Sequence, residues 1–261
     1  MEEFMWNLKT RRVPWSVLGL WFLGFFFPLH CWAEATGEPE PEVENSLGTF
    51  GGSVLLSSNY MFRSISNSND GPQVQGDINW SHDVGFYAGL WASNTNFGGP
   101  GNSMELDPYI GFAGNFGESD FSFDIGYWSY NYPKSAFDLD YGEIYVYVTY
   151  TKDKFSITPS VWYAENYFGE DFLDDVSGIA YEVTLAYQFP KNVSASLRVG
   201  EQAFDSSFDY LDFVYWDVGI DWAIEDWSIG LRWHDTDGVD PFLASRKLTD
   251  GEFVLGITRN F

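Results

Sequence analysis

Side chains in this chain alternate in polarity with a period of two over almost its whole length after residue 47. In the segment IAYEVTLAYQF, for example, Ile179 and Tyr181 share one face, and Ala180 and Glu182 share the other. A period of two is typical of β-strands, and no window in this region shows the 3.6-residue period of a helix. The sequence therefore predicts an all-β fold.

Twelve segments carry this alternation, with ten strands as the alternative count. They span residues 50–63, 73–82, 84–93, 104–117, 120–132, 139–151, 154–165, 178–189, 192–204, 211–224, 226–235 and 251–261. The connections between them alternate between short and long. The short ones lie around Asp83 and at GES, KD, PKN and ED, and the long ones are SISNSNDGP, TNFGGPGNS, PKSAFD, NYFGEDFLDDVS, DSSFDY and DGVDPFLASRKLTDG.

This sorting of the connections places all tight turns at one end of the fold and all long loops at the other. An up-and-down antiparallel β-barrel in an outer membrane has this arrangement, and its tilted strands need ~9–11 residues to cross the bilayer. A soluble Greek-key sandwich has no reason to sort its loops in this way. Because lipid cannot satisfy an open sheet edge, we expect the first strand to pair with the last.

Aromatic residues make up 20% of the chain, and many of them stand near strand ends on the apolar face. We expect these rings to face lipid and to form the two interfacial girdles of a membrane barrel. The residues concerned are Tyr60, Phe62, Trp80, Phe121, Tyr127, Trp216, Trp222, Trp227 and Trp233. Residues 64–72 would then form the first external loop.

The N-terminal segment has the layout of a secretory signal peptide. A basic region precedes an apolar core, and Ala33-Glu34-Ala35 offers a small-residue cleavage site. A membrane-anchoring helix is the alternative, but the apolar run is shorter than the ~20 residues that such a helix needs. We predict a signal peptide at 1–35, a Pro/Glu-rich periplasmic leader at 36–47 and the barrel domain at 48–261.

Removal of the signal peptide would leave a chain without cysteine, because Cys31 is the only one. Disulfides and thiolate metal sites would then be excluded from the mature protein. The formal net charge of −25 makes nucleic acid an implausible partner.

The face opposite the aromatic one is rich in glycine, serine and single charged residues, and in a membrane barrel this face lines the interior. The candidate pore-lining residues are Arg63, Gln75, Asp77, Glu105, Asp107, Glu143, Glu182, Arg198, Asp217, Asp221 and Arg232. Acidic residues outnumber basic ones in this set. Two interpretations stay open: a lumen whose charges favour cations, and a narrow barrel filled by its own ion pairs.

Four segments, SSNYMFRSISNS, QVQGDIN, GFYAGLWASN and MELDPYIGFAG, resemble in order and spacing the motifs of the TorF family, a proteobacterial group of porin-like proteins. The strong matches cover residues 57–111, and the remainder agrees in pattern and length. Ser64 departs from the family pattern, which usually has glycine after the arginine. The resemblance implies an outer-membrane barrel with pore activity and supplies no substrate.

Patterns for catalysis or metal binding are sparse after the predicted cleavage site. Two histidines remain, His82 at the turn end and His234 beside Asp235 near the loop end, and no G-x-S-x-G motif accompanies them. The loops GEDFLDDVSG and DTDGVDP carry closely spaced carboxylates but do not fit the EF-hand pattern. We expect no enzyme activity, no catalytic residue, no cofactor and no bound metal, and keep a hydrolase centred on His234 as an alternative.

These patterns together predict an outer-membrane, porin-like channel of a Gram-negative bacterium for the passive passage of small polar or cationic solutes. A non-conducting barrel with a structural or surface-interaction role is the main alternative. The expected partners are outer-membrane lipid, lipopolysaccharide, the barrel assembly machinery and the solutes themselves.

Overall fold

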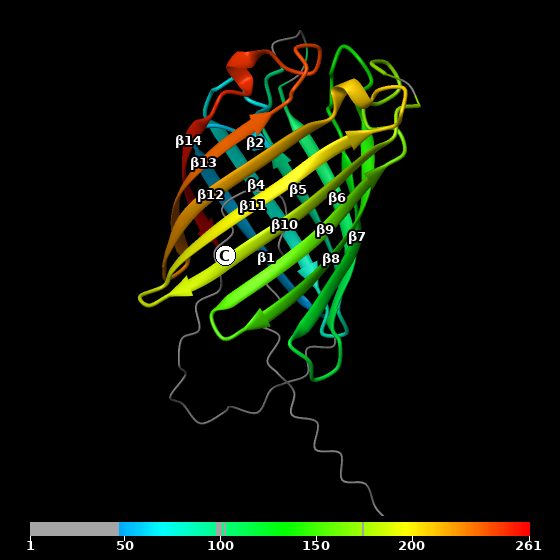
Figure 1. Cartoon of the computed structure of the whole chain (residues 1–261). Coiled ribbons are helices and arrows are strands. Elements are labelled where there is room, and N and C mark those ends of the chain that lie inside the picture. Colours follow the sequence, from blue (N-terminus) through cyan, green and yellow to red (C-terminus); the bar gives the residue numbers. More distant parts are fainter. Residues whose placement is uncertain (1–46, 98–100, 102, 174) are drawn as a thin grey trace, which may run out of the picture.

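The computed structural model describes residues 47–97, 101, 103–173 and 175–261. It is a closed antiparallel barrel of twelve strands that encloses a small two-stranded hairpin (Figure 1). The barrel strands are β1 (Thr49–Ser57), β4 (Gln73–Ser81), β5 (Phe86–Ser93), β6 (Glu105–Asn115), β7 (Phe121–Tyr130), β8 (Tyr141–Lys152), β9 (Phe155–Ala164), β10 (Gly178–Phe189), β11 (Val193–Phe204), β12 (Phe213–Ile224), β13 (Trp227–Asp237) and β14 (Glu252–Asn260). The hairpin consists of β2 (Met61–Phe62) and β3 (Ile65–Ser66), and two short 3-10 helices, η2 (Asp209–Leu211) and η3 (Arg246–Leu248), lie in loops.

The barrel closes where β1 pairs with β14, from Ser53 opposite Asn260 to Ser57 opposite Gly256. On its other edge β1 pairs with β4 along its full length. This confirms the predicted twelve-stranded up-and-down barrel with its first and last strands joined. None of the helices in the described ranges is long and apolar enough to span a membrane. The predicted signal peptide and nearly all of the predicted leader fall in residues 1–46, outside the described residues.

The connections sort to the two ends as predicted (Figure 1). At one end, which we call the turn end, residues 153–154 and 225–226 form two-residue turns whose first residues, Asp153 and Glu225, both have φ of 53°. The long connections gather at the other end, which we call the loop end. Apart from the segment after β1, the described polar connections therefore lie at the two rims, as a bilayer requires.

Apolar side chains cover the outside of the barrel. On β12, Val214, Val218 and Ile220 point outward and are exposed, while the residues between them are buried or half-buried. Trp216 lies toward the loop end of the same face and Trp222 toward the turn end. An apolar outer band flanked by aromatic residues is the surface of a transmembrane β-barrel.

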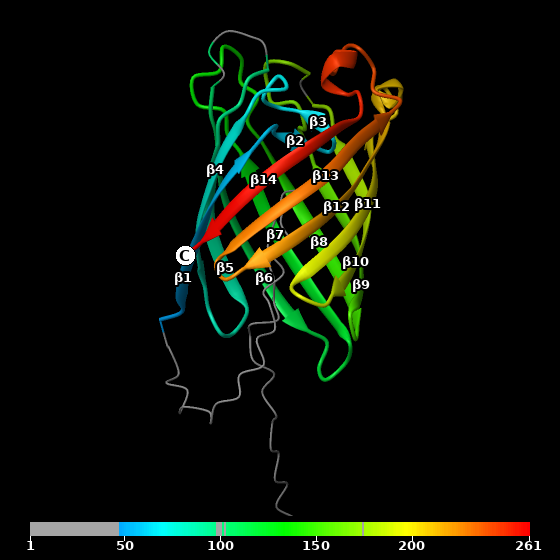
Figure 2. The same ribbon diagram turned by 90° about the vertical axis from the view of Figure 1, so that its left-hand side faces the viewer.

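The first strand ends earlier than predicted, and the segment 58–72 folds into the barrel. Figure 2 shows β2 and β3 at the loop end of the barrel. Tyr60 is fully buried, and Phe62 packs edge-on against Tyr130 with ring centroids 5.6 Å apart. The prediction that Tyr60 and Phe62 face lipid is wrong, and residues 64–66, the first part of the predicted external loop, lie inside the barrel, whereas Asn69 and Pro72 are exposed. The phenol of Tyr60 instead donates a hydrogen bond to Glu105 Oε2 inside the barrel at 2.8 Å.

Local backbone and side-chain chemistry explain why the chain turns inward here. Arg63 and Ser64 at the hairpin tip both have positive φ, 47° and 60°, as a two-residue type I′ turn requires. Below the tip, Asn59 Oδ1 accepts hydrogen bonds from the hydroxyls of Ser66 and Ser68, each at 2.7 Å. These bonds hold the two arms of the hairpin together near its base.

Candidate functional site

The hairpin tip crosses the lumen from one wall to the other. It departs from β1 and β4, which the strand order places opposite β9 and β10. Arg63 Nη2 donates to both carboxylate oxygens of Glu143 on β8, at 2.8 and 2.9 Å, and Nη1 donates to Gln202 Oε1 on β11 at 2.6 Å. The hydroxyl of Ser64 donates to the carbonyl oxygen of Trp216 on β12 at 3.0 Å. The hairpin therefore spans the lumen, and its tip is hydrogen-bonded to β8, β11 and β12.

The guanidinium of Arg63 is held in a buried and well-satisfied environment. Arg63 is 4% exposed and Glu143 is fully buried. The carboxylate of Glu143 compensates the positive charge of the buried guanidinium. Nη1 also donates to the Tyr167 hydroxyl at 3.0 Å, and the guanidinium carbon lies 4.8 Å from the ring centre of Phe62. Arg63 therefore stays charged and anchors the hairpin.

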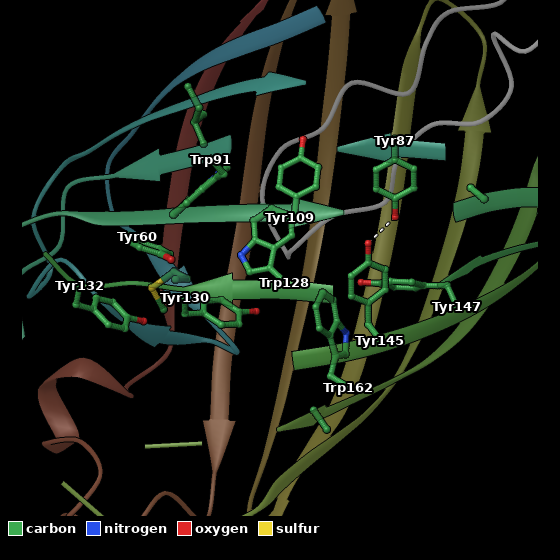
Figure 3. Close-up of a cluster of buried hydrophobic side chains, with 14 of the residues drawn as sticks. Tyr60, Tyr87, Trp91, Tyr109, Trp128, Tyr130, Tyr132, Tyr145, Tyr147 and Trp162 are labelled. Carbon is green, nitrogen blue, oxygen red and sulfur yellow. Dashed lines mark hydrogen bonds between the residues drawn. The ribbon is translucent and has the colours of Figure 1, made fainter. Parts of the chain in front are cut away.

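Tryptophan and tyrosine rings cover the lumen side of β5–β9, and we call this surface the aromatic wall (Figure 3). It comprises Tyr87, Trp91, Tyr109, Trp128, Tyr130, Tyr145, Tyr147 and Trp162. Tyr109 and Trp128 stack with ring centroids 4.4 Å apart and 3° between their planes. The hydroxyls of Tyr87 and Tyr145 share a hydrogen bond of 2.5 Å. Mutual packing of these rings fills much of this side of the lumen.

Four carboxyl groups lie among these rings and accept hydrogen bonds from neutral donors. The bonds are Tyr109 Oη to Asp77 Oδ2 at 2.8 Å, Tyr60 Oη to Glu105 Oε2 at 2.8 Å, Trp128 Nε1 to Asp107 Oδ2 at 2.9 Å and Tyr87 Oη to Asp124 Oδ1 at 2.5 Å. No lysine, arginine or histidine of the described residues forms an ion pair with any of the four. Phenol and indole groups, rather than cationic side chains, thus provide the hydrogen bonds to these carboxyls.

The inward side of β10–β13 is built differently, and we call it the charged wall. Arg198 lies 3.3 Å from Glu182 Oε1 and 2.7 Å from Asp217 Oδ2. Arg232 pairs with the other oxygen of Asp217 and lies 3.5 Å from Asp221 Oδ2. The five side chains form one continuous chain of alternating charge across four strands, so most of the charge on this wall is compensated locally.

All the predicted pore-lining residues lie inside the barrel. They are Arg63, Gln75, Asp77, Glu105, Asp107, Glu143, Glu182, Arg198, Asp217, Asp221 and Arg232. The structure brings them together in two groups, the Arg63–Glu143 pair and the charged wall. Neither Gln75 nor the aromatic-wall carboxyls lie beside an arginine. Gln75 Oε1 instead accepts a hydrogen bond from Gln73 Nε2 at 3.5 Å. A role in lining an open pore stays a prediction.

Sequence reasoning missed several interior residues. Asp124 faces inward between outward-facing Phe123 and Ile125, so its inward position could have been predicted from the alternation of polar and apolar residues. The inner aromatic residues were harder to find, because Phe86 points outward while the adjacent Tyr87 points inward. Where both faces of a strand carry large rings, polarity alternation gives no inside or outside signal.

Two features bear on the hydrolase alternative. His234 is buried, with Nδ1 3.4 Å from Ser64 Oγ, and Asp217 lies opposite it on β12. However, the Ser64 hydroxyl donates to the Trp216 carbonyl, and Asp217 already holds two arginines. The serine hydroxyl lies closer to the Trp216 carbonyl oxygen, at 3.0 Å, than to His234 Nδ1, at 3.4 Å, so this arrangement does not favour activation of a nucleophile.

His82, the other histidine among the described residues, has a structural role. His82 Nδ1 accepts a hydrogen bond from the backbone N–H of Val84 at 3.2 Å and so stabilises a turn. Within the described ranges, no group of three or more histidine, cysteine, aspartate or glutamate side chains is placed to hold a metal ion.

A family model matches most of this chain. Residues 42–261 match the family model described as "Bacterial protein of unknown function (Gcw_chp)". The chain belongs to the Gcw_chp family. The match does not carry the TorF name, so the resemblance of this Gcw_chp protein to the TorF family stays a prediction. No curated protein matches its sequence significantly.

Solved structures similar to this Gcw_chp barrel include outer-membrane porins. A structure titled "KdgM porin" has a TM-score of 0.56 at 12% identity, covering 81% of this chain and 99% of the porin. A second, "KdgM porin in complex with disordered oligogalacturonate", has a TM-score of 0.54 at 10% identity, covering 81% and 98%. A NanC porin has a TM-score of 0.53 at 11% identity, covering 80% and 98%. At these identities the likeness shows a shared porin-like barrel fold.

Proposed function

We propose that this protein is a porin-like channel in the outer membrane of a Gram-negative bacterium, through which small polar or cationic solutes pass passively. The observation that carries the proposal is the excess of carboxyl groups inside the barrel. Beside the three inward arginines stand Asp77, Glu105, Asp107, Asp124, Glu143, Glu182, Asp217 and Asp221. An excess of acidic side chains along a pore favours cations.

The hairpin limits what such a channel can pass. Because Arg63 and Ser64 reach the far wall, the free cross-section at the loop end is smaller than the barrel itself. Packing of the aromatic wall narrows the lumen further. We therefore propose a channel for solutes that are small as well as polar.

A non-conducting barrel is the second candidate, and the same hairpin favours it. The tip is anchored by a buried ion pair, and near the base Asn59 Nδ2 donates to Glu252 Oε2 on β14 at 2.7 Å. A hairpin tied to both sides of the barrel is suited to a plug. In that case the protein would have a structural or surface-interaction role.

Planar bilayer recordings with purified, refolded protein separate the two candidates. The channel proposal predicts discrete conductance steps for the unmodified protein and larger steps for Arg63→Ala, because the freed hairpin tip no longer blocks the lumen. Arg63→Lys should give a smaller increase, since a lysine retains one charged contact with Glu143. Arg246→Ala removes an exposed loop-end arginine, 92% exposed, and should leave the steps unchanged.

Two outcomes would contradict the channel. A silent bilayer at high protein load for every variant would favour a closed structural barrel. Steps that appear with Arg63→Ala alone would identify the hairpin as a permanent plug.

The surroundings of the barrel are also part of the proposal. Outer-membrane lipid would contact the apolar outer face, lipopolysaccharide would contact the loop end, and the barrel assembly machinery would insert the C-terminal strand that ends in Phe261. Recovery in the outer-membrane fraction and heat-modifiable gel mobility test this location. Recovery as a water-soluble periplasmic protein would contradict it.

A further inference from the structure

Four long connections converge at the loop end of the barrel, and we call them the loop platform (Figure 1). They join β7 to β8, β9 to β10, β11 to β12 and β13 to β14. A small apolar cluster holds three of them together, since Val176 and Leu211 are fully buried in it and Leu243 packs against it. The β7–β8 connection is attached at Asp138, whose backbone N–H donates to Asp171 Oδ2 at 2.8 Å. The four connections therefore form one packed surface.

Large aromatic side chains stand exposed on the loop platform, outside the strands that face lipid. Phe172 of the β9–β10 connection stacks on Phe242 of the β13–β14 connection, with ring centroids 5.3 Å apart and 19° between their planes. The exposed fractions are 58% for Phe137, 44% for Phe172, 57% for Tyr210 and 50% for Phe242. An aromatic side chain has ~150–250 Å² of surface, so the four expose roughly 400 Å². Exposed apolar surface of this extent often marks an interaction site.

The loop platform is also strongly acidic. Its three cationic residues are Lys134, Arg246 and Lys247. Two of them have partners, because Arg246 pairs with Asp250 at 3.2 Å and Lys247 pairs with Asp70 at 2.9 Å. Acidic residues of the platform far outnumber the cationic ones. Within the described residues, no ion pair is formed by Asp138, Glu165, Glu170, Asp171, Asp209 or Asp240.

Charge and area together select the kind of partner. A second copy of this chain and the phosphate groups of lipopolysaccharide are both negatively charged, so direct contact of either with the platform is electrostatically unfavourable. A small organic cation would cover only a fraction of the exposed rings. A standard protein interface buries ~800 Å² on each partner, of which ~57% is non-polar, and the four rings would supply most of that non-polar area.

We propose that the loop platform docks a basic polypeptide in which lysine or arginine residues are interspersed with apolar side chains. The apolar side chains would cover the exposed rings, and the cations would reach the carboxylates beside them. Two carboxylates adjoin the stacked rings: Asp171 precedes Phe172 in the chain, and Asp240 Oδ1 accepts the backbone N–H of Phe242 at 2.8 Å. The inference goes beyond the proposed channel and does not depend on conduction, because the exposed rings are not part of the lumen wall.

Fluorescence anisotropy with purified, refolded protein in non-ionic detergent micelles tests the docking. The probe is a dye-labelled peptide of Lys-Phe-Lys-Gly repeats. Peptides of Glu-Phe-Glu-Gly and Lys-Ser-Lys-Gly repeats are the matched controls that lack the positive charge or the rings, and empty micelles give the background. We expect saturable binding of the probe and at least about tenfold weaker binding of both control peptides. The affinity of the probe should fall as salt is added, because exposed charges are screened.

Paired substitutions show whether the loop platform is responsible. Phe172→Ser/Phe242→Ser removes the stacked rings. Asp171→Asn/Asp240→Asn removes two charges and retains side-chain oxygens that can accept the same backbone hydrogen bonds. Each pair should weaken binding of the probe by about fivefold or more, and the second pair should also reduce the salt dependence. Heat-modifiable gel mobility verifies that each variant is folded.

The matched control pair lies at the turn end. Asp83→Asn/Val84→Ser also removes an exposed charge and an exposed apolar side chain, and should leave binding of the probe unchanged. Absence of saturable binding, or equal binding by the unmodified protein and both platform pairs, would overturn the inference. Binding of lipopolysaccharide or of a neutral oligosaccharide at the platform without binding of the probe would overturn it as well.

Bilayer recordings separate this inference from the channel proposal. If the probe binds in micelles and the bilayer stays silent, the docking surface stands and the channel does not. If the protein conducts and the probe does not bind, the channel remains and the docking surface is refuted.

Discussion

The aromatic wall and the charged wall bury carboxyl groups in the same narrow lumen by different means. On the charged wall, Arg198 and Arg232 pair with Asp217 and with the acidic residues on either side of it. On the aromatic wall, phenol and indole groups donate to the carboxyls instead. Both arrangements satisfy the oxygens, but guanidinium groups also cancel the charge. The carboxyl groups without a cationic partner are therefore concentrated on β4–β7.

The two walls should also respond differently to mutation. A guanidinium that loses its carboxylate stays charged in a buried place, whereas a phenol that loses its acceptor is merely an unsatisfied neutral group. Removal of a carboxylate should therefore destabilise the charged wall more than the aromatic wall.

The largest effect is expected at Asp217. Asp217→Asn removes the charge shared by two buried arginines, and we expect it to lower the free energy of unfolding by about 3–5 kcal/mol. Denaturant unfolding in lipid vesicles measures this change. Asp124→Asn on the aromatic wall is the matched control, because its amide oxygen can still accept from Tyr87, and it should cost about 1 kcal/mol or less. Equal costs at the two positions would remove the distinction between the walls.

A smaller effect is expected where a tyrosine ring covers a glycine. A Cβ at Gly111 would lie 2.2 Å from the hydroxyl oxygen of Tyr87, so the ring must move. We expect Gly111→Ala to lower the free energy of unfolding by about 1–3 kcal/mol through overpacking. At Gly76 the nearest atom, the carbonyl oxygen of Ser53, would be 4.0 Å away, so Gly76→Ala should be close to neutral. The same unfolding experiment would show a loosely packed aromatic wall if Gly111→Ala were harmless.

The smallest effect compares one hydroxyl on each wall. Tyr109→Phe removes the donor to Asp77 and should cost about 1 kcal/mol, because Asp77 still accepts a hydrogen bond from Asn79 Nδ2. Tyr215→Phe removes a donor at 2.9 Å from Glu182, which still accepts from Arg198, and should cost less. Paired unfolding curves decide the order of the two variants, and a larger loss for Tyr215→Phe would contradict the comparison.

The barrel itself was predictable from the sequence because two simple signals agree along it. Alternation with a period of two gave the strands, and the sorting of short and long connections gave the topology. The boundaries of β10 at residues 178–189 agree with the prediction. Outward aromatic residues within strands, such as Trp222 and Trp227, were also placed correctly, since a lipid-facing position demands an apolar side chain.

The hairpin was not predictable in the same way. Residues 58–66 continue the alternation of β1, so Tyr60 and Phe62 resemble lipid-facing strand residues. Their burial depends on partners distant in sequence, Glu105 for Tyr60 and Glu143 for Arg63, and strand periodicity carries no information about such contacts. The pairing of interior charges into two groups depends on the same three-dimensional register.

The measurement that tests this account most directly is the zero-current potential across a planar bilayer with a KCl gradient. We expect the zero-current potential of the unmodified protein to have the sign that shows selective permeation of potassium over chloride, because no arginine is paired with the aromatic-wall carboxyls. The double variant Asp77→Asn/Asp124→Asn should move that potential toward zero. A potential of the sign that chloride carries, or a potassium preference unchanged in the double variant, would contradict the account.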